Sequence, residues 1–359
     1  MKHFESVAQL LQAASARHPR SQAARAEAHT RWAACAKPLG SLGVLEEDLE
    51  QIAAATGSAD VDLSRRAVLV FCADNGVIAQ GVTQCGPEIT TVVANSMARG
   101  TCSIDQTARV ARCGVVVVDM GILDYDPDAA GLLNRRIANG TADFTSGPAM
   151  TRAQAEQAIL AGAQVALDQV LRGKTLLATG ELGMANTTTA AAVASVLLGV
   201  EPESITGRGA GLSDEGLARK VRAIETGLAV NAPDPSDPID VLAKVGGFDI
   251  AAMCGAFLAG AACHVPVLAD GLISTVAALC ALRLCPECDD VILASHVSAE
   301  PAGKLILEAL GKKPLICAGM RLGEGTGAVA AMPLLDIACA IYGGATFAQV
   351  GMEAYVPQN

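Results

Sequence analysis

The chain has 359 residues, of which 51% are hydrophobic and only 3% aromatic, and its formal net charge is −11. A chain of this length can bury a large core, either as one large α/β domain or as two domains. The negative charge argues against a broad surface for nucleic acid. It leaves room for a small anionic substrate, because a pocket can be locally basic within an acidic protein.

Residues 1–5 do not begin a secretory signal, and no apolar run is long enough to span a membrane. Twelve cysteines in such a chain predict buried, reduced thiols. Cys285 and Cys288 form one CxxC motif without a second pair at zinc spacing, which favours a structural role over a metal or redox site. We therefore expect a cytoplasmic protein without a metal.

In chain order, the sequence predicts two helices, then short apolar strands that alternate with Ala- and Leu-rich helices, then a last helix. The predicted helices are residues 4–16, 43–55, 151–171, 187–198, 250–262, 274–284 and 328–342. The predicted strands are residues 67–73, 114–118, 175–179, 265–269, 291–294 and 314–318. Continuous apolar strands between helices are typical of a parallel sheet with both faces covered.

This pattern predicts an α/β fold, a parallel sheet flanked by helices. We expect residues 61–329 to form a Rossmann-like large domain, and residues 1–60 and 330–359 to form a small helical domain from both chain ends. Each predicted strand stops at a glycine or a polar residue, such as Asp270 or Ser295. Ligands of open α/β sheets bind at the carboxyl ends of the strands, so we expect the site there.

Two glutamates are bracketed by glycines at the ends of predicted strands. Glu324 lies in the loop of residues 320–328, and Glu181 lies in the sequence Gly-Glu-Leu-Gly of residues 180–183. Glycine lets the backbone approach a ligand closely and adopt positive φ, but a turn that needs only flexibility does not require a glutamate. The repeated pattern predicts two carboxylates in one site.

Three segments could bind an anion through free backbone N–H groups near a helix start: residues 183–189, residues 295–300, and residues 207–211 with Lys220 downstream. For residues 183–189 alone, ordinary helix capping by Asn186 or Thr187 is the favoured explanation. Together, the three segments favour a phosphate pocket.

Other motifs give weaker signals. Residues 323–328 fit G-x-G-x-x-A, but a glutamate inside the loop would repel a pyrophosphate, so a nicotinamide cofactor is disfavoured. Residues 115–119 lack the second acid of a diphosphate-sugar loop, which disfavours a magnesium site. His264 and His296 have no paired nucleophile at a recognisable spacing and are expected to be core residues. We expect no cofactor.

Eight ordered segments resemble one family, the nicotinate-nucleotide:dimethylbenzimidazole phosphoribosyltransferases, which make the α-ribazole phosphate of cobamide lower ligands. The segments are residues 37–43, 72–77, 97–100, 180–188, 245–249, 267–271, 295–300 and 320–328. The resemblance covers about residues 30–345. It implies a dimer and the transfer of phosphoribose from nicotinate mononucleotide to an aromatic base.

The resemblance also implies roles for individual residues. The catalytic base falls on Glu324 and a second active-site carboxylate falls on Glu181. The residues expected around the phosphate and ribose are Gly183, Gly209, Lys220, Asp270 and Ser298. From its charge and its place near Glu324, we add Arg321 as the candidate for the nicotinate carboxylate, and we expect its neighbour Leu322 to contact substrate.

One departure from the family pattern concerns the acceptor. Where benzimidazole-using members have Ser and Gln, this chain is expected to place Cys85 and Val93. Benzimidazoles, purines and phenols such as p-cresol therefore stay open as acceptors. The phenol-activating branch is built from two related chains, so both a homodimer and a heterodimer with a related chain are compatible with the sequence.

A non-catalytic partner subunit is a further alternative. The presence of Glu324, Glu181 and Lys220 argues against it, because a silent subunit needs none of the three.

Overall fold

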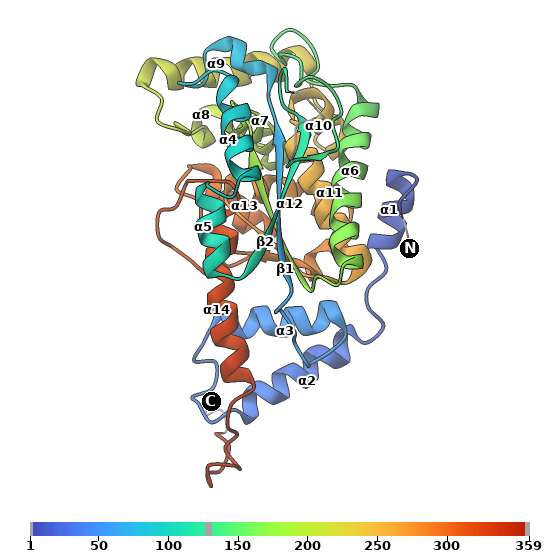
Figure 1. Ribbon diagram of the computed structural model, residues 1–359, viewed down its shortest axis with the longest axis vertical. Coiled ribbons are helices and arrows are strands. Elements are labelled where there is room, and N and C mark those ends of the chain that lie inside the picture. The colour runs from blue at the N-terminus through green and yellow to red at the C-terminus, as the bar shows by residue number, and fades with distance from the viewer. Residues whose placement is uncertain (1–2, 126–130, 356–359) are drawn as a thin grey trace.

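The computed structural model describes residues 3–125 and 131–355 (Figure 1). Within these residues, six parallel strands form one sheet in the order β3-β2-β1-β4-β5-β6. The strands are β1 Arg66–Ala73, β2 Cys113–Gly121, β3 Leu133–Asn134, β4 Leu176–Leu182, β5 Val267–Ala269 and β6 Ile292–Ala294. The predicted α/β fold with a parallel sheet is confirmed.

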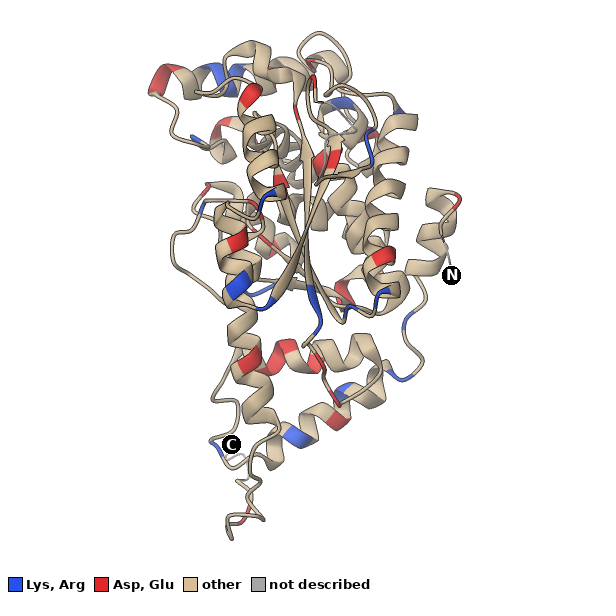
Figure 2. Ribbon diagram, viewed as in Figure 1, with Lys and Arg blue, Asp and Glu red and all other residues tan. Residues whose placement is uncertain are grey.

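The side chains of β1 alternate between two cores, because successive residues of a strand point to opposite faces. Leu69 and Phe71 belong to the core on one face of the sheet, whereas Val68 and Val70 belong to the core on the other. Every residue of β1 is buried, and its one charged side chain, Arg66, lies at its beginning (Figure 2). The continuous apolar run in the sequence therefore reflects burial on both faces.

Helices cover both faces of the sheet. On one face, α6 Arg152–Leu171 and α11 Phe248–Cys263 pack against the central strands, and α12 Leu272–Leu284 packs against β4 and β5. On the other face lie α4 Glu88–Ala98, α5 Ser103–Val110 and α14 Thr326–Tyr342. The remaining helices of the α/β part are η1 Gly76–Gln80, α7 Asn186–Leu198, α8 Pro202–Ile205, α9 Asp214–Asn231, α10 Pro238–Val245, η2 Pro286–Asp290 and α13 Ala302–Leu310.

Small residues allow α6 and α11 to touch backbone to backbone. A Cβ atom on Gly162 would lie 1.9 Å from the carbonyl oxygen of Ala252, and one on Gly255 would lie 1.8 Å from that of Ile159. The chain's richness in glycine and alanine and its few aromatic residues thus have a direct packing consequence.

Helices α2 Ser21–Ala34 and α3 Val44–Thr56 and the end of α14 meet below the sheet (Figure 1). There α2 packs against α3, and the ring of Trp32 lies 4.8 Å from that of Tyr342 at the end of α14. Helix α1 Val7–Ala14 lies elsewhere, against α11 and α6, although the sequence placed it with the small helical domain. Helix α14 runs without a break across residue 330. The division into two domains stays a prediction.

One predicted strand is wrong, and one short strand was not predicted. Residues 314–318 form no strand: Ile316 makes an isolated bridge to His296, and Pro314 has no N–H to donate. The two-residue strand β3 was not predicted, because such a short element leaves no periodic signal in the sequence. In the described part of the chain, no helix has the length and hydropathy needed to cross a bilayer.

Candidate active site

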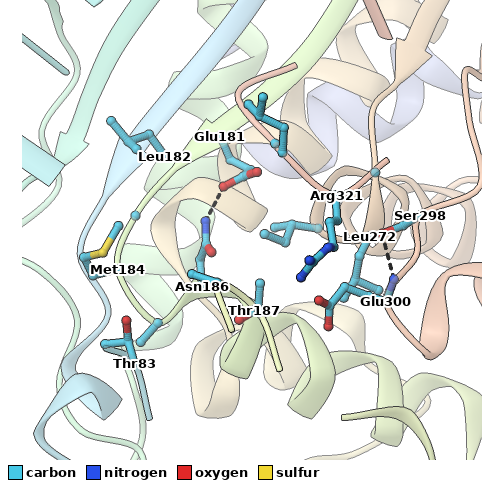
Figure 3. A pocket seen from close by; sticks show the side chains of 18 of the residues that line it. Thr83, Glu181, Leu182, Met184, Asn186, Thr187, Leu272, Ser298, Glu300 and Arg321 are labelled. Carbon is cyan, nitrogen blue, oxygen red and sulfur yellow. Dashed lines mark hydrogen bonds between the residues drawn. The ribbon is translucent and has the colours of Figure 1, made fainter. Parts of the chain in front are cut away.

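A cavity of about 290 Å³ opens at the carboxyl ends of the strands, where the sequence predicted the site (Figure 3). Most of the predicted site residues line it together. They are Glu181, Gly183, Val93, Gly209, Asp270, Ser298, Arg321, Leu322 and Glu324. Two predicted residues, Lys220 and Cys85, are not part of this lining.

Glu181 lies near the end of β4 with its side chain buried. The amide of Asn186 donates a hydrogen bond to its Oε2, which Figure 3 marks. Burial raises the pKa of Glu181 to about 8, and the carboxyl groups of Asp249 and Asp270 add to this rise, while the bond from Asn186 opposes it. A carboxyl group titrating near neutrality in a cavity is a candidate for chemistry.

Glu324 lies in a loop that has an unusual backbone. It adopts a left-handed conformation with φ +62°, between Gly323 at +88° and Gly325 at +83°. Such a φ is uncommon for a residue with a side chain and marks local strain. The backbone N–H of Ile104 donates to Oε2 of Glu324 over 3.4 Å. Burial raises the pKa of Glu324, and this N–H opposes the rise.

The glycines of each predicted motif make room for the other motif. A Cβ atom on Gly180 would lie 2.7 Å from the carbonyl carbon of Glu324, and one on Gly323 would lie 2.8 Å from Oε1 of Glu181. Because neither glycine has a side chain, the loop packs directly on the end of β4. The predicted meeting of two carboxylates in one cavity follows from this close approach.

Asp270 ties the end of β5 to the beginning of α14. Its Oδ1 accepts a hydrogen bond from the backbone N–H of Ala328 over 2.9 Å, and Nδ1 of the buried His296 lies 3.9 Å from the same oxygen. The Oγ of Ser295 is 3.1 Å from this ring nitrogen. His296 is thus a hydrogen-bonded residue of the cavity wall, as its lack of a paired nucleophile suggested.

The part of the cavity wall at the start of α7 has the features of an anion site. Helix α7 begins at Asn186, so the positive end of its dipole lies at the cavity. Lys220 is 1% exposed, and its Nζ donates to Thr187 Oγ1 over 2.8 Å and to the carbonyl oxygen of Gly207 over 3.0 Å. Burial lowers its pKa to about 8, and the carboxylate of Glu300 opposes this effect. Lys220 therefore lies behind the cavity wall rather than on its surface.

We expected Cys85 and Val93 to line the same wall of the cavity, but the structure places only Val93 there. Cys85 is exposed and lies outside the cavity lining, whereas Thr83 and Gln84 are part of that lining. The amide of Gln84 donates to the carbonyl oxygen of Gly211 and so joins two loops of the rim. The wall therefore keeps a hydroxyl and an amide, which the sequence reasoning missed because it placed the polar position at Cys85.

Sequence reasoning also missed Asn186, Asp249 and Glu300. The sequence analysis gave these three residues no individual role in the site, although they lie in the segments 183–189, 245–249 and 295–300. Asp249 is fully buried, and burial raises its pKa to about 7. All twelve cysteines are free, and no cluster of three or more potential metal ligands occurs in residues 3–125 and 131–355.

Comparison with known proteins is consistent over most of the chain. Residues 18–352 match the family model described as Phosphoribosyltransferase. The nicotinate-nucleotide–dimethylbenzimidazole phosphoribosyltransferase of Ruminiclostridium cellulolyticum is 46% identical over 322 residues, which are 89% of this chain and 91% of that protein. The protein of the same name from Thermus thermophilus is 43% identical and covers 91% of this chain and 98% of its own.

The structure resembles solved structures of these relatives as closely as the sequence does. The crystal structure of CobT from Thermus thermophilus superposes with a TM-score of 0.88 at 42% identity, covering 92% of this chain and 99% of that one. A second crystal structure of the phosphoribosyltransferase from that organism gives a TM-score of 0.87 at 41% identity and covers 92% and 98% of the two chains. This chain belongs to the nicotinate-nucleotide–dimethylbenzimidazole phosphoribosyltransferase family.

Proposed function

We propose that this chain transfers the phosphoribosyl group of nicotinate mononucleotide to an aromatic base, giving the α-riboside phosphate and nicotinate for cobamide synthesis. The observation that carries the proposal is the meeting of Glu181 and Glu324 in one cavity, whose lining also includes the start of α7, with Lys220 behind it. A cavity that combines two carboxyl groups with an anion site suits a nucleotide with a cationic ring.

The reaction needs one proton acceptor and no general acid. The bond from C1′ to the pyridinium nitrogen breaks, and its electron pair neutralises that nitrogen, so nicotinate leaves without protonation. A ring nitrogen of the acceptor forms the new bond to C1′ from the opposite face, which converts the β-nucleotide into the α-product. The second ring nitrogen of an azole acceptor then loses its proton.

In this proposal Glu324 takes that proton. Burial raises its pKa, which makes the carboxylate a stronger base than a solvated one. The left-handed backbone at φ +62° and the N–H of Ile104 hold it in place. A carboxylate within hydrogen-bond reach of the acceptor's N–H contributes roughly 10²–10⁴-fold to the rate.

Glu181 has a different role in this proposal. With its pKa at about 8, the carboxyl group is largely protonated in the empty cavity at neutral pH. A bound pyridinium cation favours the ionised form, because an opposite charge nearby lowers the pKa of a carboxyl group. The ionised Glu181, held by Asn186, stabilises positive charge at C1′ as the pyridinium leaves.

The nucleotide is bound by the other predicted residues. Gly183 and Gly209 line the cavity near the start of α7, and Ser298 lines it as well. These three residues receive the phosphate, with the charge of Lys220 behind the wall. Asp270 lies on the ribose side, and Arg321 provides a cation for the nicotinate carboxylate.

The acceptor lies against the wall formed by Val93, Leu322, Thr83 and Gln84. Apolar side chains suit the ring faces of an aromatic base, and the hydroxyl and amide suit its nitrogens. These polar groups favour an azole such as dimethylbenzimidazole over a phenol as the acceptor.

We further propose that the protein acts in the cytoplasm and as a dimer, either with itself or with a related chain. Twelve free thiols support a reducing compartment. Exposed apolar side chains near the cavity and on α14, among them Val92, Leu322 and Ile337, support an interface. Light scattering of the purified protein measures the oligomeric state.

An acceptor panel tests the proposed activity. Purified protein is incubated with nicotinate mononucleotide and one of dimethylbenzimidazole, adenine, phenol or p-cresol, and the products are identified by mass. We expect the α-riboside phosphate of dimethylbenzimidazole as the main product. Preference for phenol would reassign the acceptor class, and absence of product with every acceptor would support a non-catalytic partner subunit.

A further inference from the structure

Glu300 brings an unsatisfied buried acceptor to the cavity wall. Its Oε2 is shielded from solvent and has no hydrogen-bond partner, and among the described residues that line the cavity it is the one such side-chain oxygen. Its backbone N–H donates to Oγ of Ser298 over 3.3 Å, a contact drawn in Figure 3. The backbone is thus fixed while the carboxylate still lacks a donor.

The loop opposite Glu300 is shaped around this carboxylate. A Cβ atom on Gly207 would lie only 1.7 Å from Oε2 of Glu300, so the carboxylate occupies the space where a side chain would be. The carbonyl oxygen of the same glycine accepts the hydrogen bond from Nζ of Lys220. A carboxylate and an ammonium group therefore border one glycine, and each reduces the energetic penalty of burying the other's charge.

The missing partner must be a hydrogen-bond donor, because an ionised carboxylate only accepts. A buried acceptor without a donor is destabilising, and a ligand that supplies the donor recovers that energy on binding. The phosphate of a nucleotide offers no such donor when it is fully ionised, and a carboxylate repels it. The ribose hydroxyls are donors, and they lie within a few bonds of the phosphate that Lys220 and the start of α7 attract.

We propose that the Glu300 carboxylate is a substrate-binding group that accepts a hydrogen bond from a ribose hydroxyl of the nucleotide. The inference rests on the proposed function, since it takes the nucleotide as the ligand of this cavity. It separates two tasks on one wall: donors bind the phosphate, and one acceptor recognises the sugar. It also gives Gly207 a role, which is to leave space for the carboxylate.

Deoxy analogues of the nucleotide test this assignment. The affinities of nicotinate mononucleotide and of its 2′-deoxy and 3′-deoxy forms are measured by calorimetry for the wild type, Glu300→Gln and Glu300→Ala. Glu308→Gln, which changes an exposed glutamate of α13 paired with Lys304, is the matched control. We expect the wild type and the control to bind one deoxy form about 10- to 100-fold more weakly than the full nucleotide.

In Glu300→Ala, that hydroxyl no longer has its acceptor. The variant should bind the full nucleotide as weakly as the wild type binds the deoxy form, and removing the hydroxyl should cause no further loss. Glu300→Gln keeps the shape and one neutral acceptor oxygen, so we expect an intermediate loss. If both variants stay as sensitive to each hydroxyl as the wild type, Glu300 does not bind the ribose.

The binding experiment separates this inference from the proposed activity, because it needs no acceptor base. Binding of the nucleotide with the expected hydroxyl dependence, but without turnover in the acceptor panel, would reject the transferase and keep the role of Glu300. Turnover with unchanged hydroxyl dependence in the variants would do the reverse. A wild type that does not bind the nucleotide would reject both. If Glu300→Ala fails to fold in a melting experiment, Glu300→Gln decides.

Discussion

Asn186 lies between two buried carboxyl groups: its Nδ2 donates to Oε2 of Glu181 and is 3.3 Å from Oδ2 of Asp249. The bond it donates opposes the rise in the pKa of both acids. One neutral side chain therefore favours the ionised form of both acids, which connects helix α7 to the charge state of the end of β4.

Replacing Asn186 with alanine should raise the pKa of Glu181 further above about 8. If ionised Glu181 stabilises the charge at C1′, the ascending limb of kcat/KM against pH should move to higher pH, and activity at pH 7 should fall. The pH profile measures this. Asn231→Ala, which removes an amide bonded to Phe144 and Gly227, should leave the profile in place. If the ascending limb of kcat/KM against pH stays in place in Asn186→Ala, the ionisation that limits turnover is not that of Glu181.

Glu324→Gln should lower kcat by roughly 10²–10⁴-fold, because the amide cannot take the proton of the acceptor. The KM for the nucleotide should change little, and the melting temperature should stay near that of the wild type. Steady-state kinetics and a thermal melt check these values. Near-normal turnover would remove Glu324 as the base.

Lys220→Ala should raise the KM for the nucleotide roughly 10-fold or more, with a smaller effect on that for the acceptor, because a charged partner of the phosphate is lost. In the wild type, the pKa of Lys220 at about 8 predicts that nucleotide affinity falls as the pH rises above that value. The exposed Lys304 on α13 offers the matched control, Lys304→Ala. A larger effect on the KM for the acceptor would show that Lys220 does not act at the phosphate site.

The wall of the cavity that carries Val93 gives a prediction about acceptor preference, with a control variant at Cys85. Val93→Gln adds a polar group to the lining and should shift the ratio of kcat/KM for dimethylbenzimidazole over p-cresol toward the azole. Cys85→Ser should leave this ratio unchanged, because Cys85 is exposed and outside the cavity. The two variants are compared in the acceptor panel. The opposite ranking would show that the loop of Cys85 closes over the base.

Asp48 on α3 predicts a stability effect outside the site. It is 7% exposed, its Oδ2 has no partner, and burial raises its pKa to about 7. A carboxyl group with a raised pKa in the folded state contributes stability that is present below its ordinary pKa near 4 and is lost as the pH rises through about 7.

Asp48→Asn should therefore increase the free energy of unfolding at pH 9 by roughly 1–4 kcal/mol, since each pKa unit corresponds to about 1.4 kcal/mol. At pH 5 the gain should be roughly a third as large, because that pH lies only about one unit above the ordinary pKa near 4. Urea unfolding at both pH values measures the difference, with the exposed Asp60→Asn as control. An equal effect at both pH values would attribute the change to packing rather than to charge.

Local sequence patterns predicted the central strands and the main helices because their signals are short-range. The buried, mostly apolar runs of β1 and β4 and the long Ala-rich α6 and α11 can be recognised from their length and composition without tertiary context. Residues 314–318 show the limit of such local signals. Leu315 and Ile316 donate backbone hydrogen bonds to Ser295, and Val297 donates one to Ile316, but the run makes an isolated bridge to His296 rather than a strand.

The features of the site also divide into those that the sequence predicted and those that only the structure showed. Glycines around Glu181 and Glu324 indicated close backbone contacts, so the sequence alone pointed to two carboxylates in one cavity. It could not show what their environment does to them, because the pKa of Glu181 is raised by burial and by Asp249, Asp270 and Glu324, which are far away in the chain. It also could not separate Cys85 from Thr83 and Gln84, because one or two residues along a loop decide which side chain faces the cavity.

The sequence by itself determined the α/β class, the site at the strand ends and the family, because burial patterns and contiguous motifs are written in neighbouring residues. Only the tertiary structure decided that Lys220 lies behind the cavity wall, that α1 packs against α11, and that the buried Oε2 of Glu300 has no partner. Each of these depends on residues distant in sequence that the fold brings within a few ångströms. Burial and unpaired hydrogen-bonding groups are properties of such contacts.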